Sequence, residues 1–284
     1  METLTTVSEV HSLVKKIKKK GKSIGFVPTM GYLHDGHLSL IRASKNKADV
    51  TIASIFVNPS QFAPNEDLNR YPRDLERDKQ LLELEGTDYL FNPTDKEIYP
   101  DDFQTYINVD RITQKLEGAI RPGHFRGVTT IVSILFNCMQ PDYSFFGQKD
   151  AQQAAVIEQM VIDLKYAIEV IVCPIRREAD GLAMSSRNIF LNKQDRQKAL
   201  TLHKALTVGV KSFQTGERNS SKLISKMSKV FDEENIQFDY LTIVEATTFS
   251  DVDKLTSPGE YYFLTAAKIG VTRLIDNELV QVKS

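Results

Sequence analysis

The sequence is poor in cysteine, in net charge and in long apolar runs, and each shortage excludes a class of protein. It holds only two cysteines, Cys138 and Cys173, which are too few for a disulfide framework and lack the spacing of a metal site. The net charge of −1 provides no basic field that would attract nucleic acid or an acidic membrane. No run of about 18 apolar residues exists, so the sequence predicts no membrane span.

The overall composition is that of a globular protein. Hydrophobic residues make up 41% of the chain and charged residues 26%, which is typical of soluble domains. A length of 284 residues allows one large domain or two of ordinary size. The N-terminal stretch METLTTVSEVHSLVKKIKKK lacks the apolar core of a signal peptide, so we expect a cytoplasmic protein.

Strand and helix patterns alternate through the first part of the chain. The stretch DVTIASIFVNP is almost continuously apolar, as expected for a strand with both faces covered. Other strands are expected at 24–28, 88–93, 142–147 and 168–175, and helices at 7–20, 37–47, 72–86, 127–140 and 150–164. This alternation predicts the α/β class, with a doubly wound parallel sheet whose ligands bind beyond the carboxyl ends of the strands.

The character of the sequence changes near residue 176. A polar loop, READGLAMSSRNIFL, is followed by helix patterns and then by strand patterns. The expected helices lie near 193–213 and 220–233, and the expected strands at 238–246, 259–270 and 271–280. Helices followed by meandering strands predict a small α+β domain. We therefore expect two domains, one at 1–175 and a smaller one at 176–284.

The stretch FVPTMGYLHDGHLSL places His34 and His37 between an expected strand and an expected helix. They could be ordinary turn residues, one of them a helix cap. A metal site would need more ligands, and the spacing gathers none of the remaining histidines. Alternatively, the helix N-terminus could bind a phosphate, which Gly31 and Gly36 would allow to approach the backbone closely. Both imidazoles could then donate hydrogen bonds and neutralise charge.

Two later loops offer further positive charge. In FFGQKDAQQ, Lys149 stands beside Asp150, a good capping residue for the next helix. A surface lysine would explain this loop alone, and a phosphate contact is the alternative. In ADGLAMSSRN, Ser185, Ser186 and Arg187 offer two hydroxyls and a guanidinium, which suit a triphosphate. A solvent-facing turn could have the same composition.

Three other polar stretches have weaker interpretations. Gln61 follows a strand end and could bind a hydroxyl or carboxylate of a small substrate. Asp74 and Asp78, one helical turn apart, could hold Mg²⁺, although a solvated helix face is the commoner role. The stretch SKMSKV resembles the KMSKS loop of class I aminoacyl-tRNA synthetases. Its apolar residues fall at helical spacing, however, so we expect an amphipathic helix instead.

Six segments, in order along the chain, resemble the signature segments of the pantothenate synthetase (pantoate–β-alanine ligase) family of the nucleotidylyltransferase superfamily. They are PTMGYLHDGHLSLIRAS, SIFVNPSQF, LNRYPRDLERD, EGAIRPGHFRGV, PDYSFFGQKDAQQ and READGLAMSSRN. The resemblance covers about the whole chain. Tyr32, Ser60 and Gln148 stand where Ala, Thr and Glu are frequent in the family. These departures concern the shape of the pocket and remove no group assigned to chemistry.

The resemblance implies an enzyme that condenses (R)-pantoate with β-alanine, using ATP and Mg²⁺ and releasing AMP and pyrophosphate. A pantoyl adenylate is the implied intermediate. The domain at 1–175 would be Rossmann-like and bind ATP and pantoate, and the domain at 176–284 would close over it as a lid. The implied partners are these small substrates and a second copy of the chain in a homodimer, with no nucleic acid and no membrane.

The resemblance also implies roles for particular residues. The implied catalytic groups are His37, His34, Lys149 and Arg187. The implied ATP contacts are Met30, Gly31, Tyr32, Leu33, His34, Asp35, Gly36, His37, Gly147, Gln148, Lys149, Asp150, Arg176, Met184, Ser185, Ser186 and Arg187. Pantoate would bind Gln61 and Gln153, with Gln61 also beside β-alanine. Asp78 is the candidate Mg²⁺ ligand.

Other functions share parts of this pattern. A nucleotidylyltransferase with a different acid substrate would share the H-x-G-H turn but would not need Gln61 and Gln153. An inactive nucleotide-binding module would bind ATP without turnover. Binding of tRNA is disfavoured by the near-zero net charge and the lack of a basic, aromatic stripe.

Overall fold

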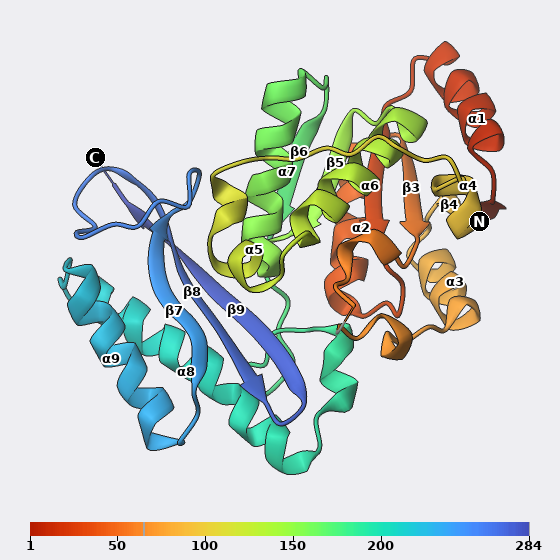
Figure 1. Ribbon diagram of the computed structural model, residues 1–284. Helices are drawn as coiled ribbons and strands as arrows, with labels where there is room; N and C mark the ends of the chain where they lie inside the picture. Colours follow the sequence, from red (N-terminus) through yellow and green to blue (C-terminus); the bar gives the residue numbers. More distant parts are fainter. Residues whose placement is uncertain (65, 284) are drawn as a thin grey trace. The chain divides into compact units, whose positions relative to one another are not determined.

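The computed structural model describes residues 1–64 and 66–283 (Figure 1). Contacts between residues divide the chain into two compact units. The first unit contains Met1–Gly147 and Val156–Pro174, and the second contains Gln148–Ala155 and Ile175–Ser284. The short segment 148–155 therefore groups with the C-terminal part of the chain. The sequence-based division at 175/176 instead places this segment in the N-terminal domain.

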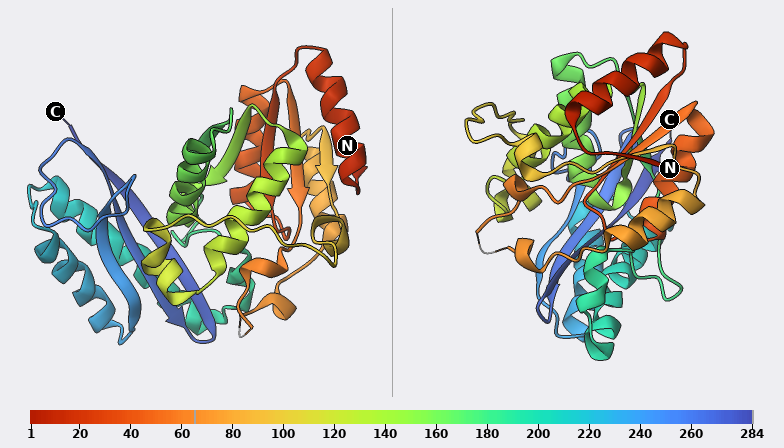
Figure 2. Two further views of the ribbon diagram at one scale, coloured as in Figure 1. Left: turned by 45° about the horizontal axis from the view of Figure 1, so that its top comes forward. Right: turned by 90° about the vertical axis from the view of Figure 1, so that its right-hand side faces the viewer.

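A six-stranded parallel sheet forms the centre of the first unit (Figures 1 and 2). Its spatial order is β1-β4-β3-β2-β5-β6, and every neighbouring pair is parallel. The strands are β1 (Glu2–Leu4), β2 (Ile24–Thr29), β3 (Val50–Ile55), β4 (Tyr89–Phe91), β5 (Tyr143–Gly147) and β6 (Glu169–Cys173). The predicted α/β class with a doubly wound parallel sheet is confirmed. Only β1 was not expected, because three residues are too few to show a pattern.

The strand order reverses between β2 and β5, which pair directly although more than a hundred residues separate them. Both strands run in the same direction, so their carboxyl ends at Thr29 and Gly147 lie at one edge of the sheet. In a doubly wound sheet, such a reversal leaves a crevice in which ligands bind. The topology therefore brings Gly147 to the same edge as the strand end from which the H-x-G-H turn departs.

Helices connect the strands of the first unit. They are α1 (Val7–Lys19), α2 (Asp35–Lys47), α3 (Leu75–Leu84), α4 (Asp95–Ile98), α5 (Leu116–Ile120), α6 (His124–Met139) and α7 (Ala151–Leu164), whose first turn belongs to the second unit. α2 packs against β2, β3 and β5, and α6 packs against β2 and α1. Most of α6 is buried, in keeping with its apolar sequence. α2 begins two residues earlier than expected, because His34 already has the extended backbone of an N-cap residue.

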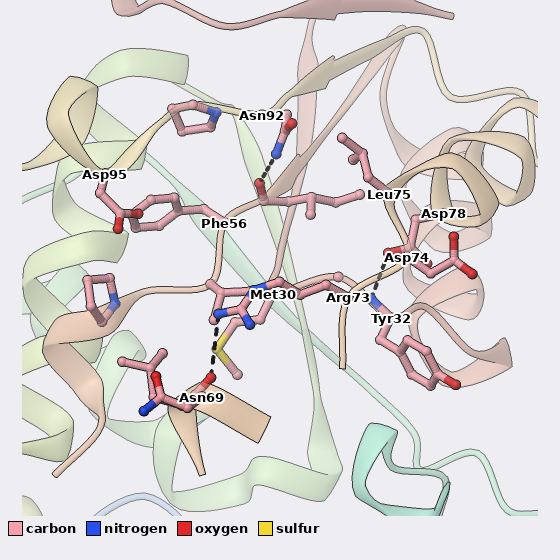
Figure 3. Close-up of a pocket in the computed structure, with 16 residues that line it drawn as sticks. Met30, Tyr32, Phe56, Asn69, Arg73, Asp74, Leu75, Asp78, Asn92 and Asp95 are labelled. Carbon is pink, nitrogen blue, oxygen red and sulfur yellow. Dashed lines mark hydrogen bonds between the residues drawn. The ribbon is translucent and has the colours of Figure 1, made fainter. Parts of the chain in front are cut away.

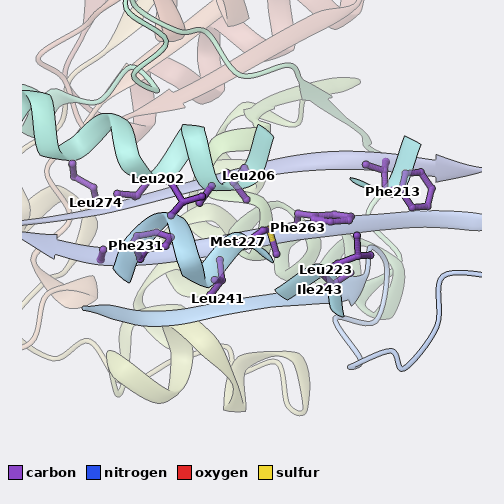
Figure 4. Packing of buried hydrophobic residues seen from close by; sticks show 14 of the residues in the cluster. Leu202, Leu206, Phe213, Leu223, Met227, Phe231, Leu241, Ile243, Phe263 and Leu274 are labelled. Carbon is purple, nitrogen blue, oxygen red and sulfur yellow. The ribbon is translucent and has the colours of Figure 1, made fainter. Parts of the chain in front are cut away.

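The second unit pairs two helices with a three-stranded antiparallel sheet. The helices are α8 (Lys193–Gln214) and α9 (Ser220–Glu233), and the sheet order is β7-β8-β9 with β7 (Phe238–Glu245), β8 (Gly259–Ile269) and β9 (Thr272–Val282). Buried side chains such as Leu206, Met227 and Phe263 pack between the helices and the sheet (Figure 4). The predicted α+β arrangement is confirmed. Lys226 and Lys229 lie on the exposed face of α9, so the KMSKS-like stretch is an amphipathic helix, as expected.

None of the helices in residues 1–64 and 66–283 is long and apolar enough to cross a membrane.

Candidate active site

The H-x-G-H turn connects β2 to α2 in the first unit. His34 is the N-cap residue of α2, and Asp35 and His37 lie in its first turn. The backbone N–H of His34 donates to Nδ1 of His37 at 3.4 Å, and the two rings lie with their centroids 4.1 Å apart. With Nδ1 of His37 as the acceptor, a neutral ring would carry its proton on Nε2. The turn thus joins a helix N-terminus, which attracts anions, to two imidazoles in close contact.

The backbone of this turn is fixed by a buried carboxylate from α3. Oδ2 of Asp78 accepts the N–H of Tyr32 at 2.6 Å, and Oδ1 accepts the N–H of Leu33 at 2.7 Å. Asp78 is only 1% exposed, and burial raises the pKa of its carboxyl against the lowering effect of the two amides. Gly31 has φ +81°, a conformation that glycine adopts readily, and a Cβ there would stand 3.1 Å from Asp78. Asp78 therefore holds the turn tightly.

This role argues against Asp78 as a magnesium ligand. Each of its oxygens already accepts a backbone N–H, and Oδ1 of nearby Asp74 accepts the N–H of Arg77. Among residues 1–64 and 66–283, no group of three or more His, Cys, Asp or Glu side chains could hold a metal ion. The acidic pair therefore does not fit a protein-built Mg²⁺ site, and His34 and His37 likewise belong to no such group.

Gln61 lies in a short turn beside the H-x-G-H loop. Its Nε2 donates to Sδ of Met30 at 3.1 Å, and its Oε1 accepts from Nδ2 of Asn58 at 2.9 Å. The turn packs on the N-terminus of α6, where a Cβ on Gly127 would come within 2.4 Å of the Ser60 carbonyl. The structure thus brings two of the predicted site residues, Gln61 and Met30, into contact.

His124 holds the backbone of Gln61. Its Nδ1 lies 2.9 Å from the carbonyl of Gln61, and its Nε2 lies 3.0 Å from the guanidinium of Arg121. Burial and the charge of Arg121 lower the pKa of His124 to about 4, so the ring is neutral near pH 7. A neutral ring with its proton on Nδ1 satisfies both contacts. Arg121 in turn makes a bidentate ion pair with Glu66, at 2.7 and 2.8 Å.

A pocket of about 460 Å³ opens beside the turn in the first unit (Figure 3). Met30, Gly31 and Tyr32 of the turn line it, together with Phe56 and Asn92. Arg73 and three carboxylates, Asp74, Asp78 and Asp95, also line it. The pocket is large enough for a small polar metabolite and lies at the predicted nucleotide-binding loop.

The remaining predicted site residues, apart from Gly147 at the end of β5, lie in the second unit. Lys149 and Asp150 lie in the turn that follows β5, with Nζ of Lys149 3.3 Å from Oδ1 of Asp150. Gln153 lies in the first turn of α7, half-buried. The carbonyl of Arg176 accepts the N–H of Met184 at 2.9 Å, and Ser185, Ser186 and Arg187 follow directly. The stretch READGLAMSSRNIFL, which was expected to be an irregular loop, is therefore closed by a backbone hydrogen bond between Arg176 and Met184.

Comparison with known proteins identifies the family. The family model for pantoate-beta-alanine ligase matches residues 2–279. The chain belongs to the pantoate–β-alanine ligase family. The pantothenate synthetase of Caldicellulosiruptor saccharolyticus is 53% identical over 283 residues, covering 99% of this chain and 100% of the relative. That of Acetivibrio thermocellus is 50% identical over 283 residues, with the same coverage.

Solved structures agree with this membership. A pantothenate synthetase from Thermus thermophilus matches with a TM-score of 0.92 and 40% identity, over 100% of both chains. A pantoate-beta-alanine ligase from Francisella tularensis matches with a TM-score of 0.78 and 36% identity, over 98% of this chain and 97% of that one. The Francisella protein was solved in complex with beta-gamma ATP and beta-alanine.

The family motifs account for the predicted site residues but not for those that hold them. Asn58 and His124 lie within two of the six family segments, but the sequence assigns no role to them. His124 reaches Gln61 across more than sixty residues of sequence, which spacing does not reveal, and the contact of Asn58 is a side-chain pairing inside a turn. Asn277 lies inside β9, a strand of mixed polar and apolar residues, and no pattern in the sequence distinguishes it.

Proposed function

We propose that the chain makes pantothenate in two steps, through a pantoyl-adenylate intermediate. As a member of the pantoate–β-alanine ligase family, it is a pantothenate biosynthesis ligase that joins pantoate to β-alanine at the expense of ATP. The observation that most supports the adenylating step is the H-x-G-H turn, whose backbone Asp78 holds at the N-terminus of α2. A fixed helix N-terminus with two imidazoles suits the handling of phosphate charge.

Residues of both units would contact ATP in this proposal. In the first unit these are the turn residues Met30–His37 and Gly147. In the second unit they are Gln148, Lys149, Asp150, Arg176, Met184, Ser185, Ser186 and Arg187. Lys149 and Arg187 would offset the repulsion between two anionic substrates, Lys149 as a compact charge and Arg187 as a planar fork. The second unit would also exclude water from the adenylate, as a lid does.

Pantoate is assigned to Gln61 and Gln153. The contact of Gln61 with Met30 supports this assignment, because it places an amide beside the nucleotide-binding turn. An amide can both donate to a carboxylate and accept from a hydroxyl, and pantoate has both groups. Gln61 would also lie beside β-alanine. The buried pair of Asn58 and His124 would keep the Gln61 side chain and carbonyl in place.

In the first step, a carboxylate oxygen of pantoate would bond to the α-phosphorus of ATP. The bond from that phosphorus to the bridging oxygen would break, and pyrophosphate would leave. His34 and His37 would donate hydrogen bonds to phosphate oxygens as charge accumulates there. In its doubly protonated form His37 would be the acid toward the leaving pyrophosphate, and in its neutral form its Nε2–H would donate a hydrogen bond to it.

In the second step, the neutral amine of β-alanine would attack the acyl carbon of the adenylate. The bond between that carbon and the phosphate oxygen would break, AMP would leave and the nitrogen would lose a proton. No protein nucleophile is required, in keeping with Cys138 and Cys173, which are buried with pKa values raised by that burial.

A requirement for Mg²⁺ remains a prediction from the family resemblance. Mg²⁺ is commonly bound through substrate phosphates with few protein carboxylates. Since the oxygens of Asp78 are engaged by the turn, we do not place the ion on that residue. A homodimer and a cytoplasmic location also remain predictions, and sedimentation of the purified protein would test the first of these.

Exchange between ATP and labelled pyrophosphate tests the proposal. We expect exchange that requires (R)-pantoate and proceeds without β-alanine, because the first step would then be reversible on its own. If exchange is absent but β-alanine allows AMP and pantothenate to form, the separate adenylation step is wrong and the ligase activity stands. Binding of ATP with no turnover under any of these conditions would instead identify an inactive nucleotide-binding module.

A further inference from the structure

Two neighbouring residues of β9, Asp276 and Asn277, contact both loops of the second unit that carry the proposed triphosphate-binding cations. We propose that this pair positions Lys149 and Arg187 for adenylation. The inference rests on the roles proposed above for those two cations. Asp276 and Asn277 would act through the loops and not on the substrate, so they are positioning residues.

Asn277 holds the turn that contains Lys149. It is 1% exposed, and its Nδ2 donates to the carbonyl of Gln148 at 2.9 Å and to that of Lys149 at 3.0 Å. Its Oδ1 accepts from Nε2 of Gln148 at 3.1 Å. The buried amide of Asn277 thus satisfies both of its N–H donors and its oxygen acceptor through Gln148 and Lys149. Moving the turn would leave several buried polar atoms without partners, which is costly.

Asp276 holds the start of the loop that leads to Arg187. It is 4% exposed, and its two carboxylate oxygens accept from the guanidinium of Arg177 at 2.7 and 3.1 Å. Glu278 adds a third contact to the same guanidinium at 2.7 Å. Arg177 also donates to the carbonyl of Gly181 at 3.2 Å, so it ties β9 to the tip of the loop.

Contacts across the loop connect the anchored Arg177 to the residues on both sides of Arg187. Arg177 forms a bridge with Ala183 across the loop, and Met184 donates to the carbonyl of Arg176. Nδ2 of Asn188 then donates to Glu178 at 2.7 Å and to the carbonyl of Ala183 at 3.0 Å. Arg187 lies between two anchored positions, so a shift of Arg177 would displace its backbone as well.

The geometry of a strand explains why one dipeptide can serve two loops. Successive side chains of a strand point to opposite faces. Asp276 and Asn277 therefore reach to opposite sides of β9, where each meets a different loop. The loops that carry Lys149 and Arg187 are therefore both anchored to the same strand, β9. This strand pairs with β8 along its length.

The first test replaces the amide that holds the Lys149 turn. We expect Asn277→Ala to lower pantoate-dependent ATP–pyrophosphate exchange about ten- to a hundredfold, the scale of a small misplacement of a catalytic group. Asn219→Ala is the matched control, since Asn219 caps α9 in the same unit and has no proposed contact with substrate. Thermal unfolding of both variants separates lost positioning from lost folding. If Asn277→Ala does not fold, Asn277→Ser takes its place.

Double variants show through which cation each residue acts. In a Lys149→Ala background, Asn277→Ala should lower exchange by less than about threefold further, because residues that act as a unit are not additive. In an Arg187→Ala background, Asn277→Ala should still lower exchange by most of the factor seen in the otherwise unchanged protein. Asp276→Asn should show the opposite pattern: little further loss in the Arg187→Ala background, and most of its effect in the Lys149→Ala background. Fully additive losses in every background would show that β9 only supports the fold, and would overturn the inference.

The same series separates failure of the inference from failure of the proposed function. Normal exchange in Lys149→Ala would remove Lys149 from the adenylation machinery, and the inference for Asn277 would be lost with it. Reduced exchange in Lys149→Ala together with normal exchange in Asn277→Ala would leave the proposed function intact. In that case only the positioning role of Asn277 would be wrong.

Discussion

The H-x-G-H turn of the first unit and the Lys149 turn of the second unit are both fixed through their main chains, but by opposite chemistry. Asp78 accepts two consecutive N–H groups, whereas Asn277 donates to two consecutive carbonyls. Each anchor is a single side chain, 1% exposed, that lies far away in sequence. The comparison teaches that a polar side chain far away in sequence can fix a loop through its main chain, without contacting the side chains that are proposed to react.

The largest expected effect comes from removing the side chain that is proposed to act on phosphate in either turn, His37 or Lys149. We expect His37→Ala or Lys149→Ala to lower the adenylation rate at least about a hundredfold, the scale for losing one donor that stabilises transition-state charge. Pyrophosphate exchange at saturating ATP and pantoate measures the rate. A near-normal rate in either variant would remove that residue from its proposed role.

Removing the anchor of the H-x-G-H turn should have the next largest effect. Asp78→Ala leaves the amides of Tyr32 and Leu33 without their acceptor, at about 1–3 kcal/mol for each buried group. We expect exchange to fall about ten- to a hundredfold and the free energy of unfolding to fall as well. Extra Mg²⁺ should restore none of the lost rate. Rescue by millimolar Mg²⁺ would contradict the positioning role and return Asp78 to the metal site.

A third experiment uses pH to probe the anchor of Gln61. Because the pKa of His124 is about 4 in the native state and 6.5 in a model peptide, the unfolded chain binds a proton first as pH falls. The stabilising contribution is present above pH 6.5 and is lost as pH falls toward 4. From pH 7.5 to 5 the loss is about 2 kcal/mol. Denaturant unfolding at both pH values should show a smaller loss in His124→Gln, and equal losses would exclude this assignment.

The smallest effect is expected where sequence similarity alone suggested a function. Lys229 lies on the exposed face of α9, within the stretch that resembles a KMSKS loop. Lys229→Ala should leave exchange within about twofold and the unfolding free energy within about 0.5 kcal/mol, as for most surface substitutions. A loss comparable to that in Lys149→Ala would mean that α9 takes part in nucleotide binding.

Local patterns predicted most of the fold, because β3 lies in an almost continuous apolar run and helices such as α1 and α3 end just before a glycine. The start of α2 was misplaced by two residues, since His34 has no strong intrinsic preference as an N-cap. The motif residues of the candidate site were found by resemblance. The sequence shows Asp78 only as one of two carboxylates a helical turn apart, and its hold on the turn could not be predicted because its contact to Tyr32 joins positions 46 residues apart. Asn277 was not predicted because it stands among other polar residues of β9 and its partners lie more than 120 residues away in the sequence.

The excursion of segment 148–155 into the second unit has a consequence for dissecting the protein. The chain passes between its two units at 147/148, at 155/156 and at 174/175, so neither unit is one continuous stretch. A fragment that ends near residue 175 would retain Lys149 but lose Asn277, the residue that holds its turn. The two units are therefore not interchangeable modules, and recombination between relatives at that point would separate the lysine from its own anchor.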